Sequence, residues 1–250
     1  MPDIAFLLLV AGTFLLAGTV KGVIGLGLPS VSLAILTVAL DLPTAMALLL
    51  VPSFVTNFWQ AMIGGNARAI LTRVWPFLAM ATITVWIGTA ALTRVNLVFP
   101  TALLGGLLVI YAGVTLAGLR IKIPSRHEVW AGPFLGTANG VLTGMTGSFV
   151  VPGVMFLQAI GLSRDMLIQA MGILFTFSTL ALAASLQQAD FLTIEMGLVS
   201  ASAVLPAIIG MVLGQRLRHS LSEQTFRKAF FVSLLILGAY IIANAFRVFR

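Results

Sequence analysis

The sequence predicts an all-α polytopic membrane protein, built as an inverted 5+5 repeat with two glycine-rich broken or re-entrant helix hairpins. Two observations carry this prediction. Of the 250 residues, 60% are hydrophobic and only 8% are charged, a balance that would cover a soluble domain with aliphatic side chains. A glycine-rich segment also occurs twice, at residues 18–27 and 136–147, which indicates two related halves.

Ten apolar segments follow one another along the chain, five in each half. In the first half they are residues 4–20, 28–41, 43–64, 70–93 and 97–119; in the second half they are 129–142, 147–161, 165–187, 191–215 and 224–247. The longest polar stretch, 120–128, separates the halves. We therefore predict a first inverted repeat at 1–119, a cytoplasmic linker at 120–128 and a second inverted repeat at 129–250, all within one membrane domain.

The segments that flank the glycine-rich stretches are short. Residues 28–41 and 129–142 would each give roughly 21 Å of helix, whereas the hydrocarbon core of a bilayer is about 30 Å thick. We expect each glycine-rich stretch to lie inside the membrane, at the tip of a re-entrant or shallow hairpin. Irregular backbone is tolerated there only against protein or a wet cavity.

The positions of the basic residues favour hairpins over kinks in continuous spans. Leaving out Lys21, ten basic residues fall on one side and three on the other with hairpins, whereas continuous spans split them seven against six. Only the hairpins follow the excess of Lys and Arg in cytoplasmic loops. Each half then crosses the membrane an odd number of times, so the halves have opposite orientations and both termini lie outside the cytoplasm. The ten are Arg68, Arg73, Arg120, Lys122, Arg126, Arg164, Arg216, Arg218, Arg227 and Lys228, and the three are Arg94, Arg247 and Arg250.

Composition also excludes several classes of function. The net charge of +7 does not indicate nucleic-acid binding, because the basic residues lie in short loops between apolar spans. The chain has no cysteine, which excludes disulfides and thiol chemistry. His127 and His219 lie among Arg and Glu residues in loops and cannot form a metal site by themselves. No acid–base or nucleophile constellation occurs, so we expect neither an enzyme nor a cofactor.

The glycine-rich segments supply the first set of candidate substrate-binding residues. Glycine lets the backbone approach a ligand closely, and helix N-termini offer N–H groups with partial positive charge. The alternative interpretation is tight helix packing, because Gly18-x-x-x-Gly22 and Gly136-x-x-x-Gly140-x-x-x-Gly144 are small-residue contact motifs. The candidates are Lys21, Gly22, Gly25, Gly27, Asn139, Gly140, Thr143, Gly144, Thr146, Gly147 and Ser148.

Lys21 is the one charged residue in either copy, and its repeat partner Asn139 is neutral. A lysine at the bilayer centre costs about 2.5–3.5 kcal/mol on insertion scales, so it needs a partner or a watery cavity. One fixed positive charge fits a small anion. The alternative is that Lys21 extends to the cytoplasmic interface.

A second set of candidates lies in the third and eighth segments, which correspond in the repeat. They are Asn57, Gln60, Gln169 and Thr176. Asn57 and Gln60 are three residues apart, on one face of a helix. We expect these side chains to supply neutral hydrogen-bond donors near the glycine-rich tips, with interhelical hydrogen bonding as the alternative.

The stretches at 21–27 (Lys-Gly-Val-Ile-Gly-Leu-Gly) and 139–147 (Asn-Gly-Val-Leu-Thr-Gly-Met-Thr-Gly) resemble the TauE/SafE family of membrane permeases, also called the sulfite exporter family. The resemblance extends over essentially the whole chain through the duplicated layout. It implies an inner-membrane transporter of small sulfur-containing anions, such as sulfite or organosulfonates like sulfoacetate.

Within that resemblance we expect a secondary transporter, most simply an exporter, that works by alternating access with substrate at the two hairpin tips. Its expected partners are a small anionic substrate, the lipid bilayer and a second copy in a homodimer. Two alternatives stay open: a transporter of another small organic anion, such as a carboxylate or amino acid, and a non-transporting membrane partner protein.

Overall fold

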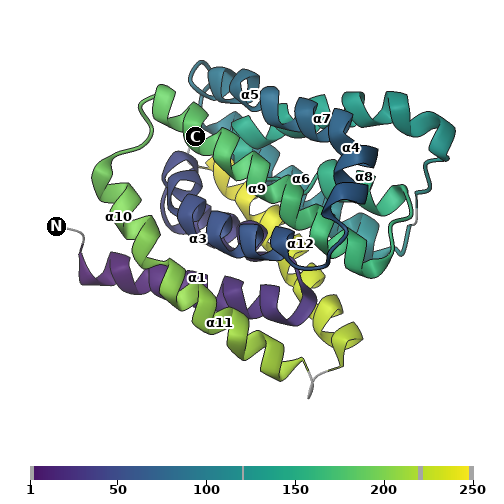
Figure 1. Ribbon diagram of the computed structural model, residues 1–250. Helices are drawn as coiled ribbons and strands as arrows, with labels where there is room; N and C mark the ends of the chain where they lie inside the picture. Colours follow the sequence, from purple (N-terminus) through teal and green to yellow (C-terminus); the bar gives the residue numbers. More distant parts are fainter. Residues whose placement is uncertain (1–2, 120, 219–221, 248–250) are drawn as a thin grey trace. The chain divides into compact units, whose positions relative to one another are not determined.

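The computed structural model describes residues 3–119, 121–218 and 222–247 (Figure 1). Three residues named above, Arg120, His219 and Arg250, lie outside these ranges. Within them the chain is 83% helix with no strand, so the predicted all-α class is confirmed. The helices are α1 (Ile4–Ile24), α2 (Leu28–Ala39), α3 (Leu42–Met62), α4 (Ala67–Ile83), α5 (Val85–Leu92), α6 (Val98–Leu116), α7 (Ser125–Thr146), α8 (Gly153–Ala159), α9 (Arg164–Gln188), α10 (Ile194–Ser202), α11 (Val204–Leu217) and α12 (Glu223–Arg247).

Every predicted apolar segment contains a helix, and two of them contain a pair. The fourth segment divides into α4 and α5 at Thr84, whose hydroxyl donates to the carbonyl oxygen of Met80 at 2.7 Å and so competes within the helical ladder. The ninth divides into α10 and α11 just before Pro206, which has no N–H to continue the ladder. Both interruptions therefore have a local cause.

Helix bounds differ most from the prediction at the glycine-rich segments. The first segment was expected to end at 20, but α1 continues to Ile24. Helix α7 extends beyond 129–142 at both ends, and α8 has only 7 residues where 147–161 was expected. The helices pass through Gly18, Gly22 and Gly140 because another helix packs directly on those glycines, as described below.

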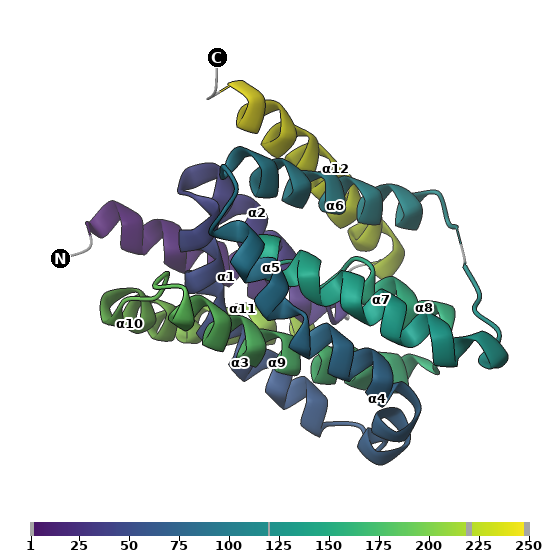
Figure 2. The ribbon, with the colours of Figure 1, turned by 90° about the horizontal axis from the view of Figure 1, so that it is seen from above.

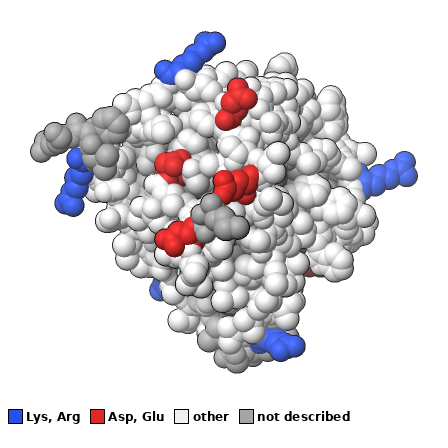
Figure 3. All heavy atoms as spheres, turned by 90° about the vertical axis from the view of Figure 1, so that its left-hand side faces the viewer, with Lys and Arg blue, Asp and Glu red and all other residues white. Residues whose placement is uncertain are grey.

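Seven helical stretches of the described residues are long and apolar enough to cross a membrane, judged by length and composition. Helix α2 is shorter than these. Large apolar side chains are exposed, among them Trp130 at 81% and Ile194 at 86%, and the face in Figure 3 is mostly neither acidic nor basic. Such a surface suits contact with lipid rather than water, so the chain is a multi-pass membrane protein. The seven stretches are Ile4–Ile24, Leu42–Met62, Ala67–Leu92, Val98–Leu116, Arg164–Gln188, Ile194–Leu217 and Gln224–Arg247.

The chain forms two compact units. Unit 1 consists of Met1–Pro52, Asn96–Gly118 and Phe191–Arg250. Inside it α1 packs along α11, and α6 packs along α12 (Figures 1 and 2). Its core includes the fully buried rings of Tyr111 and Phe231, whose centroids are 5.2 Å apart in an edge-on contact.

Unit 2 consists of Ser53–Val95 and Leu119–Asp190. Inside it α7 packs against α4 and α5, and α9 packs against α4, α5 and α8 (Figure 2). The rings of Phe77 and Phe156, 4.6 Å apart, belong to its core. Each unit thus combines helices from both halves of the sequence, because the partner of α1 is α11 and the partners of α7 are α4 and α5.

Candidate functional site

The first helix break separates α1 from α2. Helix α1 ends at Gly25, whose φ is 78° and whose N–H donates to the carbonyl oxygen of Lys21 at 2.8 Å. Gly27 has a φ of 110° and precedes α2. Only glycine adopts these left-handed angles at no steric cost, and Pro29 suits the first turn of the next helix. The sequence therefore interrupts the helix for three residues and restarts it at once.

The second break separates α7 from α8 and is longer. Gly147 ends α7 with a φ of 71°, and its N–H donates to the carbonyl oxygen of Thr143 at 2.7 Å. Two threonines hold the segment that follows. The hydroxyl of Thr143 donates to the carbonyl oxygen of Ser148 at 3.0 Å, and the hydroxyl of Thr146 accepts from the N–H of Ser148 at 3.2 Å. These hydroxyls stabilise the break itself.

Lys21 and Asn139, the repeat partners, have different surroundings. Lys21 is 5% exposed and lies in the last turn of α1, where a positive charge complements the helix dipole. Asn139 is fully buried, and its Oδ1 accepts from the N–H of Gly153 at 2.8 Å, at the start of α8. The Nδ2 of Asn139 has no hydrogen-bond partner among the described residues. A charged residue therefore precedes one break, and a helix-capping amide precedes the other.

The glycines inside α1 and α7 are contact points between helices. A Cβ on Gly18 would collide with the carbonyl oxygen of Ala207, and one on Gly22 with that of Met211, both in α11. In unit 2 the collisions would be with α4 and α5, the two helices beside α7 in Figure 2. The packing interpretation thus holds for these glycines, whatever else they do. The unit 2 contacts are Gly136 with Phe77, Gly140 with Ala81 and Thr84, and Gly144 with Val85.

The two sets of glycine contacts keep a constant spacing. Gly18 and Gly136 are 118 residues apart, as are Gly22 and Gly140. Their partners, Ala207 with Phe77 and Met211 with Ala81, are each 130 residues apart. The same backbone packing therefore occurs once in each unit.

The neutral candidates of α3 and α9 bond to one another's helices. The Nε2 of Gln60 donates to the carbonyl oxygen of Ile168 at 2.7 Å, and the Nε2 of Gln169 donates to that of Ala61 at 2.9 Å. The Oε1 of Gln169 accepts from the N–H of Asn66 at 2.9 Å. These bonds fasten the end of α3 and the turn after it to α9.

The other two neutral candidates bond within their own helices. The Nδ2 of Asn57 donates to the hydroxyl of Ser53 at 2.9 Å. The hydroxyl of Thr176 donates to the carbonyl oxygen of Gly172 at 2.7 Å. Both pairs are four residues apart, as expected for bonds along one helix face.

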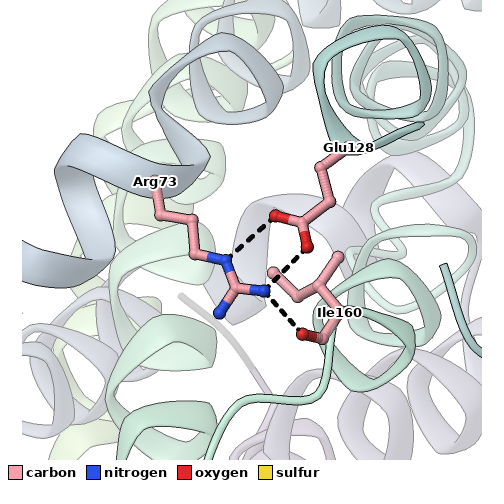
Figure 4. A network of polar contacts seen from close by, with 3 residues as sticks. All are labelled: Arg73, Glu128 and Ile160. Atoms are coloured by element: carbon pink, nitrogen blue, oxygen red, sulfur yellow. Dashed lines mark hydrogen bonds and ion pairs between the residues drawn. The ribbon is translucent and has the colours of Figure 1, made fainter. Parts of the chain in front are cut away.

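Two features were missed by reasoning from the sequence. Arg73 of α4 forms a bidentate ion pair with Glu128 of α7, with Nε–Oε2 at 2.9 Å and Nη2–Oε1 at 2.7 Å (Figure 4). The same Nη2 donates to the carbonyl oxygen of Ile160 after α8, also at 2.7 Å. Arg73 was counted only in the balance of basic residues between the two sides, and Glu128 only as part of the linker 120–128, because nothing local pairs residues 55 positions apart.

The second missed feature is a small group of buried hydroxyls without partners. Among the described residues the side-chain oxygens of Ser30, Thr37 and Ser178 are buried and make no hydrogen bond. Ser30 lies directly after the first break, inside an apolar stretch, and that position was the available signal. No group of three or more potential metal-ligating side chains occurs in the described part of the chain.

Comparison with known proteins gives one family. The family model for the sulfite exporter TauE/SafE matches residues 10–241, nearly the whole chain. Neither the curated proteins nor the solved structures contain a match. The match includes both glycine-rich breaks and confirms the resemblance based on residues 21–27 and 139–147. The chain therefore belongs to the TauE/SafE sulfite exporter family of membrane transporters.

Proposed function

We propose that the protein is a secondary transporter that exports small sulfur-containing anions, such as sulfite or an organosulfonate like sulfoacetate. Family membership supports the class of solute. The observation that carries the site is Lys21, a positive charge only 5% exposed in a membrane-crossing helix, one turn before the helix breaks. Charged side chains inside membranes mark substrate and ion pathways.

Alternating access would move the glycine-rich breaks between the two sides of the membrane. Tight backbone contacts such as Gly22 against α11 and Gly144 against α5 give packed surfaces that move as bodies. The constant spacing of these contacts supports an inverted repeat. In the same proposal the protein lies in the inner membrane, and both termini lie outside the cytoplasm. A homodimer is part of the same proposal.

The substrate test is a measurement of anion binding by the purified full-length protein in nanodiscs. Sulfite and sulfoacetate are compared with acetate and with a neutral amino acid. We expect Lys21→Ala to weaken binding of the sulfur anions by about tenfold to a hundredfold, because a hydrogen bond to a charged group is worth about 1.5–3 kcal/mol. Asn57→Ala is expected to have a smaller effect, since its side chain bonds to Ser53.

Lys228→Ala is the matched control, because Lys228 is an exposed lysine of α12. Wild-type affinity in Lys21→Ala would remove Lys21 from the site. Tighter binding of acetate than of sulfite would favour a carboxylate transporter. Flux in proteoliposomes then separates transport from a non-transporting role, since a flat trace with every sulfur anion would contradict the proposal.

Orientation is testable with single cysteines, because the natural chain has none. Lys122→Cys and Asp190→Cys are expected to react with an impermeant thiol reagent from opposite sides of the membrane. Labelling of both from one side would contradict the inverted repeat.

A further inference from the structure

Ser30, directly after the first break, is a buried polar side chain without a hydrogen-bond partner among the described residues. It is 2% exposed. Ser32, two residues later in the same helix, donates to the carbonyl oxygens of Leu28 at 2.8 Å and Pro29 at 3.2 Å. A buried hydroxyl without a partner is costly. Unlike Ser32, Ser30 therefore has a hydroxyl that is available to a partner outside the chain.

The start of α2 also has backbone donors to offer. The first N–H groups of a helix have no acceptor within it, and in α2 they belong to Leu28 and Ser30, since Pro29 has none. Its N-cap residue, Gly27, has no side chain to accept from these N–H groups, whereas Ser163 caps α9 and Thr193 caps α10 in the described part of the chain. Helix α2 has 12 residues, so its dipole places partial positive charge at its N-terminus, beside Leu28.

Helix geometry directs the hydroxyl of Ser30 towards the end of α2 that carries these backbone donors. Side chains of an α-helix lean towards its N-terminus, so a residue in the first turn presents its hydroxyl near the first N–H groups. Three donors from two residues therefore gather at one helix end. This set matches an oxyanion with three oxygens on one sulfur atom.

The glycines of the break shape the space beside these donors. A Cβ on Gly25 would meet no atom within 4 Å, so the backbone there borders open space. A Cβ on Gly27 would approach Val20 Cγ1 at 2.9 Å and Phe230 Cζ at 3.1 Å. One side of the break is open, and the other is closed by apolar side chains. Such a place suits a small ligand with one charged end.

We propose that the break between α1 and α2 binds the sulfite or sulfonate group of the substrate. The N–H groups of Leu28 and Ser30 and the hydroxyl of Ser30 donate to its oxygens, and Lys21 in the preceding turn supplies the positive charge. This assignment rests on the proposed function and narrows it to one of the two breaks. At the other break the N–H of Gly153 already donates to Asn139.

The buried position of Ser30 limits access of a ligand to its hydroxyl. Although the backbone at Gly25 borders open space, the hydroxyl of Ser30 is closed off, so the anion reaches it only in a conformation that uncovers the start of α2. Binding then replaces an unsatisfied hydroxyl and uncapped N–H groups with charge-assisted hydrogen bonds, which favours the occupied state.

The test compares two alanine variants of neighbouring serines in the same helix. Wild type, Ser30→Ala and Ser32→Ala are purified as full-length protein in nanodiscs and titrated with sulfite and with methanesulfonate by calorimetry. We expect Ser30→Ala to weaken both affinities by about tenfold and Ser32→Ala to leave them within about twofold. Ser30→Cys, which keeps the unbranched shape with a somewhat larger atom but donates weakly, is expected to behave like Ser30→Ala.

Melting temperatures without ligand separate binding from folding. Ser30→Ala is expected to melt at or above the temperature of the wild type, because it removes a buried hydroxyl without a partner. Equal affinities in Ser30→Ala and Ser32→Ala, with binding intact in the wild type, would overturn this site and leave the proposed function standing. A wild type that binds neither probe would overturn the proposed function and this site together.

Discussion

Substituting Gly22 tests how tightly α1 and α11 pack. In Gly22→Ala the new methyl group would collide with the carbonyl oxygen of Met211 and approach the Cα of Gly214 at 2.9 Å. Both are backbone atoms, so no side chain can rotate away. Gly12 in the same helix has no atom within 4 Å of the equivalent position, which makes Gly12→Ala the matched control.

The size of the effect follows from these contacts. To restore ordinary contact distances, α11 has to move away by roughly 1 Å, because side chains in a close-packed interior leave no slack. Overpacking of this kind costs about 1–3 kcal/mol, and a collision between backbones belongs at the upper end. Alanine recovers about 1 kcal/mol of helix propensity. We expect a net loss of about 2 kcal/mol for Gly22→Ala and no loss for Gly12→Ala.

Thermal unfolding in detergent, followed by the fraction of protein that stays monodisperse, measures the difference. A loss of about 2 kcal/mol corresponds to a melting temperature lower by about 4–8 °C for a chain of this length. The packing between α1 and α11 would be refuted if the two variants melted together, or if Gly22→Ala melted higher.

Three further predictions concern polar contacts of unit 2. Gln169→Ala should lower the free energy of unfolding by about 1–3 kcal/mol, because it leaves two partly buried backbone groups without their side-chain partner. Gln187→Ala, at an exposed position of α9, is the control, and equal melting temperatures would contradict the expectation. Asn139→Ala should cost about 0.5–2 kcal/mol by removing the cap of α8, so an unchanged melting curve would argue against capping. Arg73→Lys should lose the bidentate pair with Glu128 and lower the free energy of unfolding by roughly 0.5–1 kcal/mol in low salt. The difference from the wild type should fade in 1 M salt, and a loss that is insensitive to salt would contradict an ion-pair origin.

Local features of the sequence were enough to predict the helices and the family. Hydropathy over about 20 residues marks a membrane segment by itself, so the ten apolar segments each contain a helix. Gly25 and Gly147 end helices and Gly27 precedes one, because their backbone angles suit glycine, and that too is local. The motifs at 21–27 and 139–147 were sufficient to indicate the family.

The role of the remaining glycines required the tertiary structure. Gly18, Gly22 and Gly140 could break a helix or let another helix approach, and sequence alone allows both. They stay helical because α11 or α4 packs on them. For the same reason the compact units combine helices from the two halves of the chain, a pairing that periodicity within one segment does not encode.

The sequence by itself determined the class of protein, the ten apolar segments and the two places where helices break, because each depends on a few neighbouring residues. Only the tertiary structure decided which polar side chains have hydrogen-bond or ion-pair partners. Gln60 and Gln169 bond between helices, Arg73 meets Glu128, and Ser30 has no partner among the described residues. The hydrogen-bond partner of a buried side chain depends on which distant segment lies beside it, and the packing of the helices determines which segment that is.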